Sequence, residues 1–415
     1  MSTIKREILA NGMPLVLVPI AGTRVVAEMI AFPAGARFEH QHENGIAHFL
    51  EHLVFKGGTK FDSAQKVNYR AEELGASMNA FTSHDLVAFH ITSRAENSSD
   101  TFDLLTDMLA RPIIPEDELD KERGVVIQEI NMYDDQPSSV AFHLVDEAAY
   151  GGHPLGRPIL GPAEHIRNFS KQEIMDFRER TWTPAESGIV LAGAVDKVDL
   201  DAIRELAGRF ELTGPTFPAE AAPSLTAKKL IKHKDSEQSH LCLQWQPQID
   251  ASDPEQRAAF TVFTGLLGGS MGSRLFEEIR EERGLCYSIS ARSYYHHDAV
   301  TMNIYGGLES KALAEAHEQI LAIVDDLRTN GPTEEQVHRA KAYLAGSMVR
   351  ALESSNSVAT STTRQLLLHQ QLIEPDQLVA NIDAVSYDAV KEMAAALTGD
   401  PAIGLVGPHD ADVLG

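Results

Sequence analysis

The segment AEELGASMNAFTSHDLVAFHI, residues 71–91, has a counterpart later in the chain, and the pair reveals the organisation of the fold. A segment of helical periodicity ends at Gly75, and strands follow it, the last being the apolar stretch DLVAFHITS. The second half of the chain repeats this order in REERGLCYSISARSYYHHDAVTMNI, residues 280–304, which places Gly284 opposite Gly75. A repeat of this length predicts two homologous domains of roughly 200 residues each.

A second pair of segments supports the repeat. IIPEDELDKERGVVIQE, residues 113–129, resembles NGPTEEQVHRAKAYLAG, residues 330–346. Long helical segments are combined with strands such as MPLVLVPI and VVAEMIAF, which predicts an α+β fold with long helices on a mostly antiparallel sheet in each domain. We expect domains at 1–214 and 230–415, joined by the Pro- and Ala-rich linker 215–229.

The composition is that of an ordinary soluble globular protein, with 43% hydrophobic and 23% charged residues among 415. The excess of 60 Asp and Glu over 36 Lys and Arg argues against nucleic acid or an anionic membrane surface as a partner. No apolar run approaches the roughly 20 residues of a membrane span. Two cysteines, Cys242 and Cys286, are too few for a disulfide framework, so a reducing compartment, the cytoplasm, is the default location.

The segment NGIAHFLEHLVFKGG, residues 44–58, is the first candidate for chemistry. On a helix, residues at i, i+3 and i+4 share one face, so His48, Glu51 and His52 point the same way, and Asn44 is predicted to be the N-cap. Two imidazoles at this spacing can hold one Zn²⁺, and a neighbouring glutamate can act as general base. The alternative is an amphipathic helix without a site, because such a five-residue match arises by chance in about one chain in twenty.

A catalytic zinc needs a third protein ligand, which leaves one position for water. The segment DKERGVVIQEINMY supplies Glu122 and Glu129, seven residues apart and therefore on one helix face. Alone, this pair would be an exposed charged edge. In the second half of the repeat, residues 257–261 stand opposite HFLEH and Gly346 stands opposite Glu129, so only the first domain would bind a metal.

These spacings together resemble the pitrilysin family of zinc peptidases, which includes insulysin and the mitochondrial processing peptidase. The resemblance extends over nearly the whole chain, to about residue 400. It implies that His48, His52 and Glu129 bind one Zn²⁺ per chain in the N-terminal domain, that Glu51 is the general base, and that Glu122 supports the site. Ligation by two histidines and a glutamate also accepts Co²⁺ or Mn²⁺.

A second family signature lies in GGSMGSRLFEEIREERGLCYSIS. The family has an arginine and a tyrosine seven residues apart that help bind substrate and stabilise the reaction at the scissile carbonyl, and Arg280 and Tyr287 match them. The segment is predicted as a helix that ends before Gly284, and Tyr287 starts a strand that alternates through Ile289 and Ala291. Without the resemblance, the pair would be a surface arginine and a strand tyrosine.

The strand along which family members bind substrate has a counterpart in MNAFTSHDLVAFH. Asn79, Ala80 and Thr82 match a strand to which an extended peptide can add through main-chain hydrogen bonds. The alternative is an ordinary half-buried strand. His84 and Asp85 differ from the commonest family residues, and we assign them no role.

The resemblance implies a zinc-dependent metalloendopeptidase that hydrolyses peptide bonds in unfolded peptides or presequences with metal-activated water. Short members of the family pair two subunits, so we expect a homodimer in which Arg280 and Tyr287 act at the partner's zinc site. Two alternatives remain: a catalytically silent scaffold, like the family's core subunits in respiratory complexes, and a peptide-binding protein that keeps zinc without turnover. We expect neither nucleic acid nor a membrane as a partner.

Overall fold

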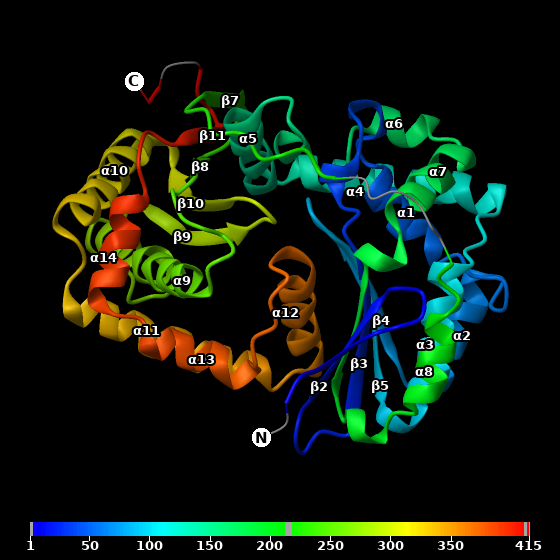
Figure 1. Cartoon of the computed structure of the whole chain (residues 1–415). Helices are drawn as coiled ribbons and strands as arrows, with labels where there is room; N and C mark the ends of the chain where they lie inside the picture. Colours follow the sequence, from blue (N-terminus) through cyan, green and yellow to red (C-terminus); the bar gives the residue numbers. More distant parts are fainter. Residues whose placement is uncertain (1–2, 212–217, 411–412, 415) are drawn as a thin grey trace. The chain divides into compact units, whose positions relative to one another are not determined.

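The computed structural model describes residues 3–211, 218–410 and 413–414 (Figure 1). Its described parts form two compact units, and each unit is assembled from three separate segments of the chain. Unit 1 consists of Met1–Ile130, Pro158–Glu220 and Arg350–Pro375. Unit 2 consists of Asn131–Arg157, Ala221–Val349 and Asp376–Gly415.

Unit 1 contains a six-stranded sheet in the order β1-β2-β6-β3-β5-β4. β2 and β6 run parallel, and the other neighbouring strands run antiparallel. The strands are β1 (Lys5–Ile8), β2 (Pro14–Pro19), β3 (Val25–Phe32), β4 (Ser77–Thr82), β5 (Val87–Arg94) and β6 (Gly188–Gly193).

Unit 2 contains a five-stranded sheet in the order β7-β11-β8-β10-β9, with β7 and β11 parallel and the other neighbours antiparallel. Apart from β1, the two sheets have the same strand order, so β2, β6, β3, β5 and β4 correspond to β7, β11, β8, β10 and β9. This confirms the predicted α+β fold of two similar domains with mostly antiparallel sheets. The strands are β7 (Lys229–His233), β8 (Gln238–Trp245), β9 (Cys286–Tyr295), β10 (Val300–Glu309) and β11 (Ala402–Gly407).

The two glycines that align the repeat have the same backbone conformation. Gly75 and Gly284 have φ angles of 60° and 63°, in the left-handed region that glycine adopts without a steric penalty. Each lies just past the C-cap of a helix and just before an edge strand, β4 or β9. A left-handed residue at this position is a common way to end a helix, which explains why glycine occurs in both halves.

Helices cover one face of the unit 1 sheet. The core between them contains Phe32 and Trp182, whose rings stack with centroids 4.3 Å apart. The helices that begin in unit 1 before β7 are α1 (Ile46–Val54), α2 (Ala64–Glu73), α3 (Ser98–Ala110), α4 (Glu116–Asp135), α6 (Ala163–Asn168), α7 (Lys171–Thr181) and α8 (Leu200–Ala207).

The opposite face of each sheet is covered by a helix from the other half of the sequence. α12 (Ser355–Leu368) packs on β6, β3 and β5 of unit 1, where Figure 1 shows it in orange beside the blue strands. α5 (Pro137–Tyr150) packs on β11, β8 and β7 of unit 2. The contact with α5 requires Gly404, because a Cβ there would lie 2.3 Å from the Ala141 carbonyl oxygen. The two halves of the sequence therefore exchange one helix each.

The other face of the unit 2 sheet packs against a second apolar core that includes Trp245 and Phe263. Helical segments around it are α9 (Pro254–Gly268), the π-helix Phe276–Glu282, α10 (Leu313–Asn330), α11 (Glu334–Leu352), α13 (Pro375–Ala384) and α14 (Tyr387–Ala396). None of the described helices is long and apolar enough to cross a membrane. Of the predicted linker, 215–217 lies outside the described residues, and 218–228 has no regular secondary structure before β7.

A glutamate lies in the middle of the unit 1 core. Glu28 on β3 has no exposed surface, and the side chain of Thr101 on α3 is close to it. Burial raises the pKa of Glu28 well above its usual value, and the nearby Thr101 side chain offsets this only in part. The folded protein therefore favours the neutral carboxyl group more strongly than the unfolded chain does.

Glu28→Gln should change the pH dependence of stability in a defined direction. Because the pKa is higher in the folded state, wild-type stability falls as pH rises above about 4.5, the unfolded value. Gln does not titrate. As pH rises through this window, the free energy of unfolding of the variant should therefore increase relative to that of wild type, by up to about 1.4 kcal/mol per pH unit. Urea unfolding from pH 5 to 8 measures this gain. The exposed control Glu205→Gln should show none, and a pH-independent difference for Glu28→Gln would contradict the prediction.

Candidate metal centre

Helix α1 carries the HFLEH motif and begins differently from the sequence prediction. Its N-cap is Gly45, with a φ angle of 100°, so the prediction of Asn44 as N-cap is wrong by one residue. Asn44 instead donates from Nδ2 to the Pro158 carbonyl oxygen at 2.9 Å. A Cβ on Gly45 would lie 2.6 Å from the Leu160 carbonyl oxygen, so only glycine fits here. The apolar side of α1 is buried in the unit 1 core, through Phe49, Leu50 and Leu53.

The structure brings together His48, His52 and Glu129 from α1 and α4. Oε2 of Glu129 lies 3.3 Å from Nε2 of His52 and 3.8 Å from Nε2 of His48. One ligand atom from each residue lies within 4.8 Å of the others, and no other such group of three occurs among the described residues. Donor atoms around a tetrahedral zinc are about 3.3 Å apart, and neutral imidazole and carboxylate are ligands that zinc accepts. The residues therefore fit a zinc ion.

Glu122 orients one of these histidines. Its Oε1 lies 2.9 Å from Nδ1 of His52, and Lys56 forms an ion pair with its Oε2. Burial acts to raise the pKa of Glu122, but the hydrogen bonds with His52 and Lys56 outweigh it and hold the pKa below its usual value. An ionised Glu122 accepts a hydrogen bond from Nδ1–H of His52, so the lone pair of His52 is on Nε2, which faces Glu129. Sequence reasoning missed Lys56, which lies one helical turn after His52.

The two histidines differ in their protonation. Burial, reinforced by the nearby His52, lowers the pKa of His48 to about 3, so His48 is neutral and can act as a ligand at neutral pH. Burial acts in the same direction on His52, but Glu122 and Glu129 outweigh it and raise its pKa. A metal ion would therefore displace a proton from His52 on binding, because only neutral imidazole is a ligand.

Glu51, the candidate base, is held from the neighbouring strand. Oγ1 of Thr82 in β4 donates to Oε2 of Glu51 at 2.5 Å. Burial raises the pKa of Glu51, and the bond from Thr82 counteracts this. β4 is the last strand of its sheet and pairs only with β5 among the described strands, so the main chain of Asn79 and Ala80 lies at a sheet edge. Thr82 was predicted to lie on the substrate strand, but its contact with Glu51 was not predicted.

Arg280 and Tyr287 lie next to each other in unit 2. The Arg280 guanidinium lies 4.6 Å from the ring centroid of Phe276 and 5.7 Å from that of Tyr287. The predicted helix before Gly284 is present, but Phe276–Glu282 is wound as a π-helix, a form often found at functional sites.

The predicted alternation of the strand from Tyr287 is wrong at its first residue. Leu308 pairs with Cys286 and Gly307 pairs with Ser288, so Tyr287 is the additional residue of a β-bulge. Ile289 is buried, whereas Tyr287 is 80% exposed. A bulge redirects a side chain in this way, and the apolar alternation does not show it.

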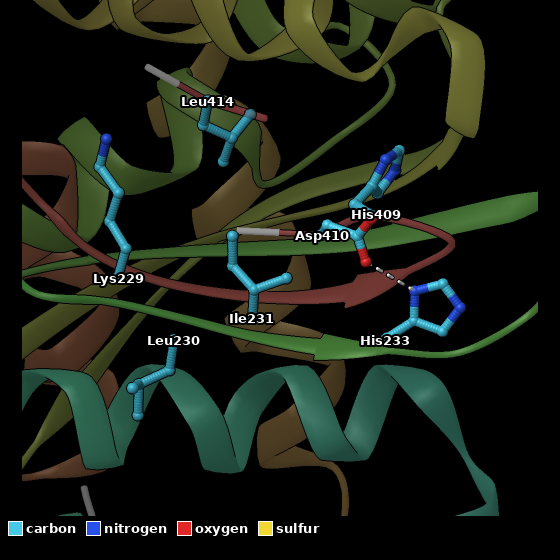
Figure 2. A pocket seen from close by; sticks show the side chains of 7 residues that line it. All are labelled: Lys229, Leu230, Ile231, His233, His409, Asp410 and Leu414. Carbon is cyan, nitrogen blue, oxygen red and sulfur yellow. Dashed lines mark ion pairs between the residues drawn. The ribbon is translucent and has the colours of Figure 1, made fainter. Parts of the chain in front are cut away.

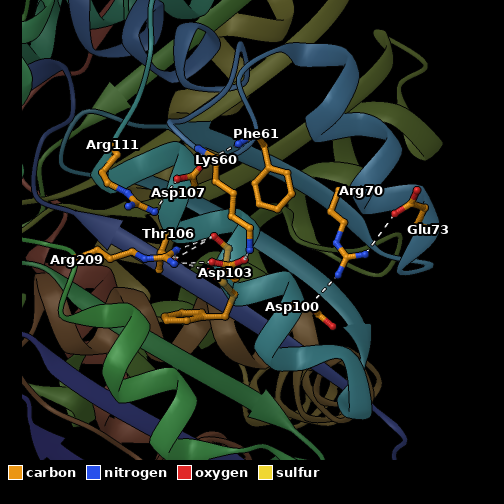
Figure 3. Close-up of polar contacts among 11 residues, drawn as sticks. Lys60, Phe61, Arg70, Glu73, Asp100, Asp103, Thr106, Asp107, Arg111 and Arg209 are labelled. Atoms are coloured by element: carbon orange, nitrogen blue, oxygen red, sulfur yellow. Dashed lines mark hydrogen bonds and ion pairs between the residues drawn. The ribbon is translucent and has the colours of Figure 1, made fainter.

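The loop after α1 is fixed by two aspartates of α3 (Figure 3). Asp107 is fully buried and accepts hydrogen bonds from the backbone N–H groups of Lys60 and Phe61, at 2.8 and 3.0 Å. Asp103 forms ion pairs with the Lys60 ammonium and, at 2.7 Å, with Arg209. Charged partners and backbone donors together hold this loop against α3, so the C-terminal side of α1 has a defined position.

Two further histidines, His233 and His409, lie near each other in unit 2 (Figure 2). A cavity of about 330 Å³ is lined by Lys229, Leu230, Ile231, His233, His409, Asp410 and Leu414. His233 pairs with Asp410 at 3.7 Å and with Asp235 at 3.2 Å, while His409 hydrogen-bonds to Ser239 at 2.6 Å. These imidazoles bind separate partners and do not converge on one point.

Lys56→Met should weaken metal binding without removing a ligand. The loss of the ammonium raises the pKa of Glu122, so Glu122 becomes protonated at a higher pH and stops accepting from His52. We expect zinc affinity at pH 6.5 to fall about tenfold, with a smaller loss at pH 8. Competition with a chromophoric chelator measures both values. Lys66→Met, which breaks an exposed pair with Asp62, is the control, and equal effects of the two substitutions would refute the role of Lys56.

Two family models match the chain. Residues 16–163 match the model described as insulinase, peptidase family M16, and residues 168–344 match the model described as the peptidase M16 inactive domain. The first match includes all three residues of the metal group, and the second includes Arg280 and Tyr287. The metal group, which is the single such group among the described residues, thus lies in the part that matches the peptidase model and not in the part that matches the inactive domain.

Relatives and solved structures agree with these matches. The chain is 32% identical over 406 residues to the uncharacterized zinc protease YmxG of Bacillus subtilis, covering 98% of both chains. A peptidase M16 inactive domain from Pseudomonas fluorescens has the same fold, with a TM-score of 0.90, 19% identity and 99% of each chain covered. A protease from Helicobacter pylori gives a TM-score of 0.86 at 21% identity, with 98% of this chain and 100% of that chain covered. The chain therefore belongs to peptidase family M16, the insulinase family.

Proposed function

We propose that this chain is a zinc-dependent endopeptidase that hydrolyses peptide bonds in unfolded peptides. The observation that carries the proposal is the convergence of His48, His52 and Glu129, with Glu51 on the same helix face. Family membership and the zinc protease names of the relatives support it. Domains at 1–214 and 230–415 remain the proposed limits of the two homologous halves.

Glu51 would act as the general base. A zinc ion held by His48, His52 and Glu129 would polarise the scissile carbonyl and make water more acidic. Thr82 occupies Oε2 of Glu51, which leaves Oε1 to take a proton from the attacking water and pass it to the leaving amine. The pKa of Glu51 is raised and therefore lies closer to neutral pH. A group with such a pKa can both accept a proton and donate it again at that pH.

An extended peptide would bind along β4. The edge of this strand offers main-chain donors and acceptors at Asn79 and Ala80, and Thr82 connects the same strand to Glu51. Pairing with a strand edge requires an unfolded segment of substrate, which favours peptides and presequences over folded proteins.

A homodimer would complete each site. The exposed Tyr287 and the half-exposed Arg280 are suited to contact a substrate held on a second chain, where they would stabilise the developing oxyanion. One chain carries both the metal group and this pair, so two equivalent sites would form. The two cysteines are unpaired and buried, which favours a reducing compartment such as the cytoplasm.

Glu51→Gln separates an enzyme from a silent zinc-binding homologue. We expect cleavage of a quenched peptide library to fall by about 10²- to 10⁴-fold while zinc content is unchanged, because the base is lost and the ligands are kept. The exposed control Glu72→Gln should keep both properties. If zinc-loaded wild type and Glu51→Gln both leave the library uncut, the chain is a silent homologue and the enzyme proposal is wrong.

Mixing two inactive variants tests whether the sites are shared. In a 1:1 mixture of Glu51→Gln and Arg280→Ala chains, half the dimers combine one chain of each kind, and each such dimer has one intact site. Activity should therefore recover to about a quarter of the wild-type value.

The double variant Glu51→Gln/Arg280→Ala is the control for this experiment. Mixed with Glu51→Gln chains, it gives no intact site and should restore no activity. Failure of the first mixture to recover, with subunit exchange shown by mass spectrometry of isotope-labelled chains, would contradict the shared site.

A further inference from the structure

The start of helix α1 lacks the side-chain cap that a helix normally has. The first turn of any helix has backbone N–H groups without partners in the helix, and the N-cap side chain usually accepts from one of them. Here the N-cap is Gly45, which has no side chain, and any Cβ would collide with the Leu160 carbonyl. Asn44 points its amide elsewhere, to Pro158. Another residue must satisfy this helix end.

Glu39 supplies the missing acceptors from six residues upstream. Its Oε1 accepts from the N–H of Ala47 at 2.9 Å, and its Oε2 accepts from the N–H of Gly45 at 3.1 Å. Oε2 also accepts from Nδ2 of Asn44 at 3.0 Å. Glu39 is 4% exposed, so its carboxyl group meets these donors away from bulk water.

The surroundings of this contact leave little room for movement. A Cβ on Gly161 would lie 2.2 Å from the Asn44 carbonyl oxygen, so the 160–161 backbone is pressed directly against the residues before α1. His165 adds a hydrogen bond of 3.0 Å from Nδ1 to the same carbonyl oxygen. The carboxyl group of Glu39 therefore sets both where α1 begins and how it is rotated about its axis.

We propose that Glu39 is a positioning residue for the metal centre, because it fixes helix α1 at the residue directly before His48. Ala47, which donates to Glu39, precedes the first ligand, and the second ligand and Glu51 lie within the next turn. A small rotation of a nine-residue helix moves all three polar side chains together, whereas Glu129 stays on α4. The inference rests on the proposed function only in taking His48, His52 and Glu129 as the metal ligands.

Burial raises the pKa of Glu39 to about 8, and the donors from Asn44, Ala47 and Gly45 each lower it. Burial outweighs these donors at neutral pH, so the ionised form that they favour becomes the main form only above about pH 8. Gln in its place keeps the volume but directs an N–H₂ group at one of the donors. Glu39→Gln is thus the substitution that removes the contact with least disturbance of packing.

The experiment compares metal binding with stability in purified full-length protein. Zinc dissociation constants are measured by chelator competition, Co²⁺ spectra in the visible range report ligand geometry, and unfolding is followed in EDTA. Asp199→Ala is the matched control, since Asp199 caps α8 of the same unit by accepting from Asp201 and Ala202 at 3.2 Å.

For Glu39→Gln we expect the zinc dissociation constant to rise by about 10- to 100-fold and the Co²⁺ spectrum to change. Asp199→Ala should lower the unfolding midpoint while the constant and the spectrum stay at wild-type values. If Glu39→Gln loses stability like the control and keeps wild-type metal binding, Glu39 is a stability cap alone and the proposal is wrong. Peptide cleavage is not measured, so a failure here is distinct from a failure of the peptidase proposal.

A second measurement applies even if Glu39→Gln does not fold. In metal-free wild-type protein, the amide hydrogens of Gly45 and Ala47 should exchange more slowly than those of Asp201 and Ala202, because the first pair is bound to a buried carboxyl group. Exchange of Gly45 and Ala47 at the rate of unprotected amides would overturn the proposal.

Discussion

Helix α1 must satisfy two environments at once, and the arrangement of unit 1 around the candidate metal centre follows from this. Its apolar side belongs to the main core, while His48, Glu51 and His52 lie at the border of that core, where an unpaired polar group is costly. Separate elements each supply a partner: α4 brings Glu122 and Glu129, and β4 brings Thr82. These contacts provide partners for the buried polar side chains of α1, and they also orient these side chains.

The second unit uses the same scaffold position for packing. On α9, which stands opposite α1 in the repeat, Arg257 donates to the Ala251 carbonyl oxygen at 2.7 Å and Thr261 hydrogen-bonds to Tyr295 at 3.0 Å. Phe260 between them is fully buried. Both helices thus have polar groups bound by local partners, but on α9 these partners are not arranged around a common point. Among the described residues, the candidate metal group therefore lies in one copy of the duplicated fold, and the corresponding positions of the other copy serve packing.

Much of the fold and of the candidate site could be predicted from the sequence. Strand alternation and the pairing of Gly75 with Gly284 gave the repeat, since both features depend on local backbone geometry. The spacing of the histidines and glutamates gave the metal group, because helical periodicity places i, i+4 and i+7 residues on one face.

Features that depend on tertiary contacts could not be predicted. Gly45 replaces Asn44 as N-cap because the Leu160 carbonyl lies against it, and no local pattern shows that contact. In the sequence, nothing distinguishes Lys56 from an ordinary surface lysine. The bulge at Tyr287 and the π-helix before it are irregularities that apolar alternation does not encode. Figure 1 also shows α12 on the sheet of unit 1, although α12 belongs to the second half of the sequence.

This exchange of α5 and α12 has a consequence for how the chain acquires its structure. A ribosome releases the six strands of the first sheet long before it reaches Ser355, the start of α12. Until then Val16, Met29 and Val190 on that sheet lack the helix that buries them. Synthesis therefore passes through a stage in which an apolar sheet face is open to solvent or to other chains. Completion of the first unit depends on the last quarter of the sequence, so the two halves must mature together.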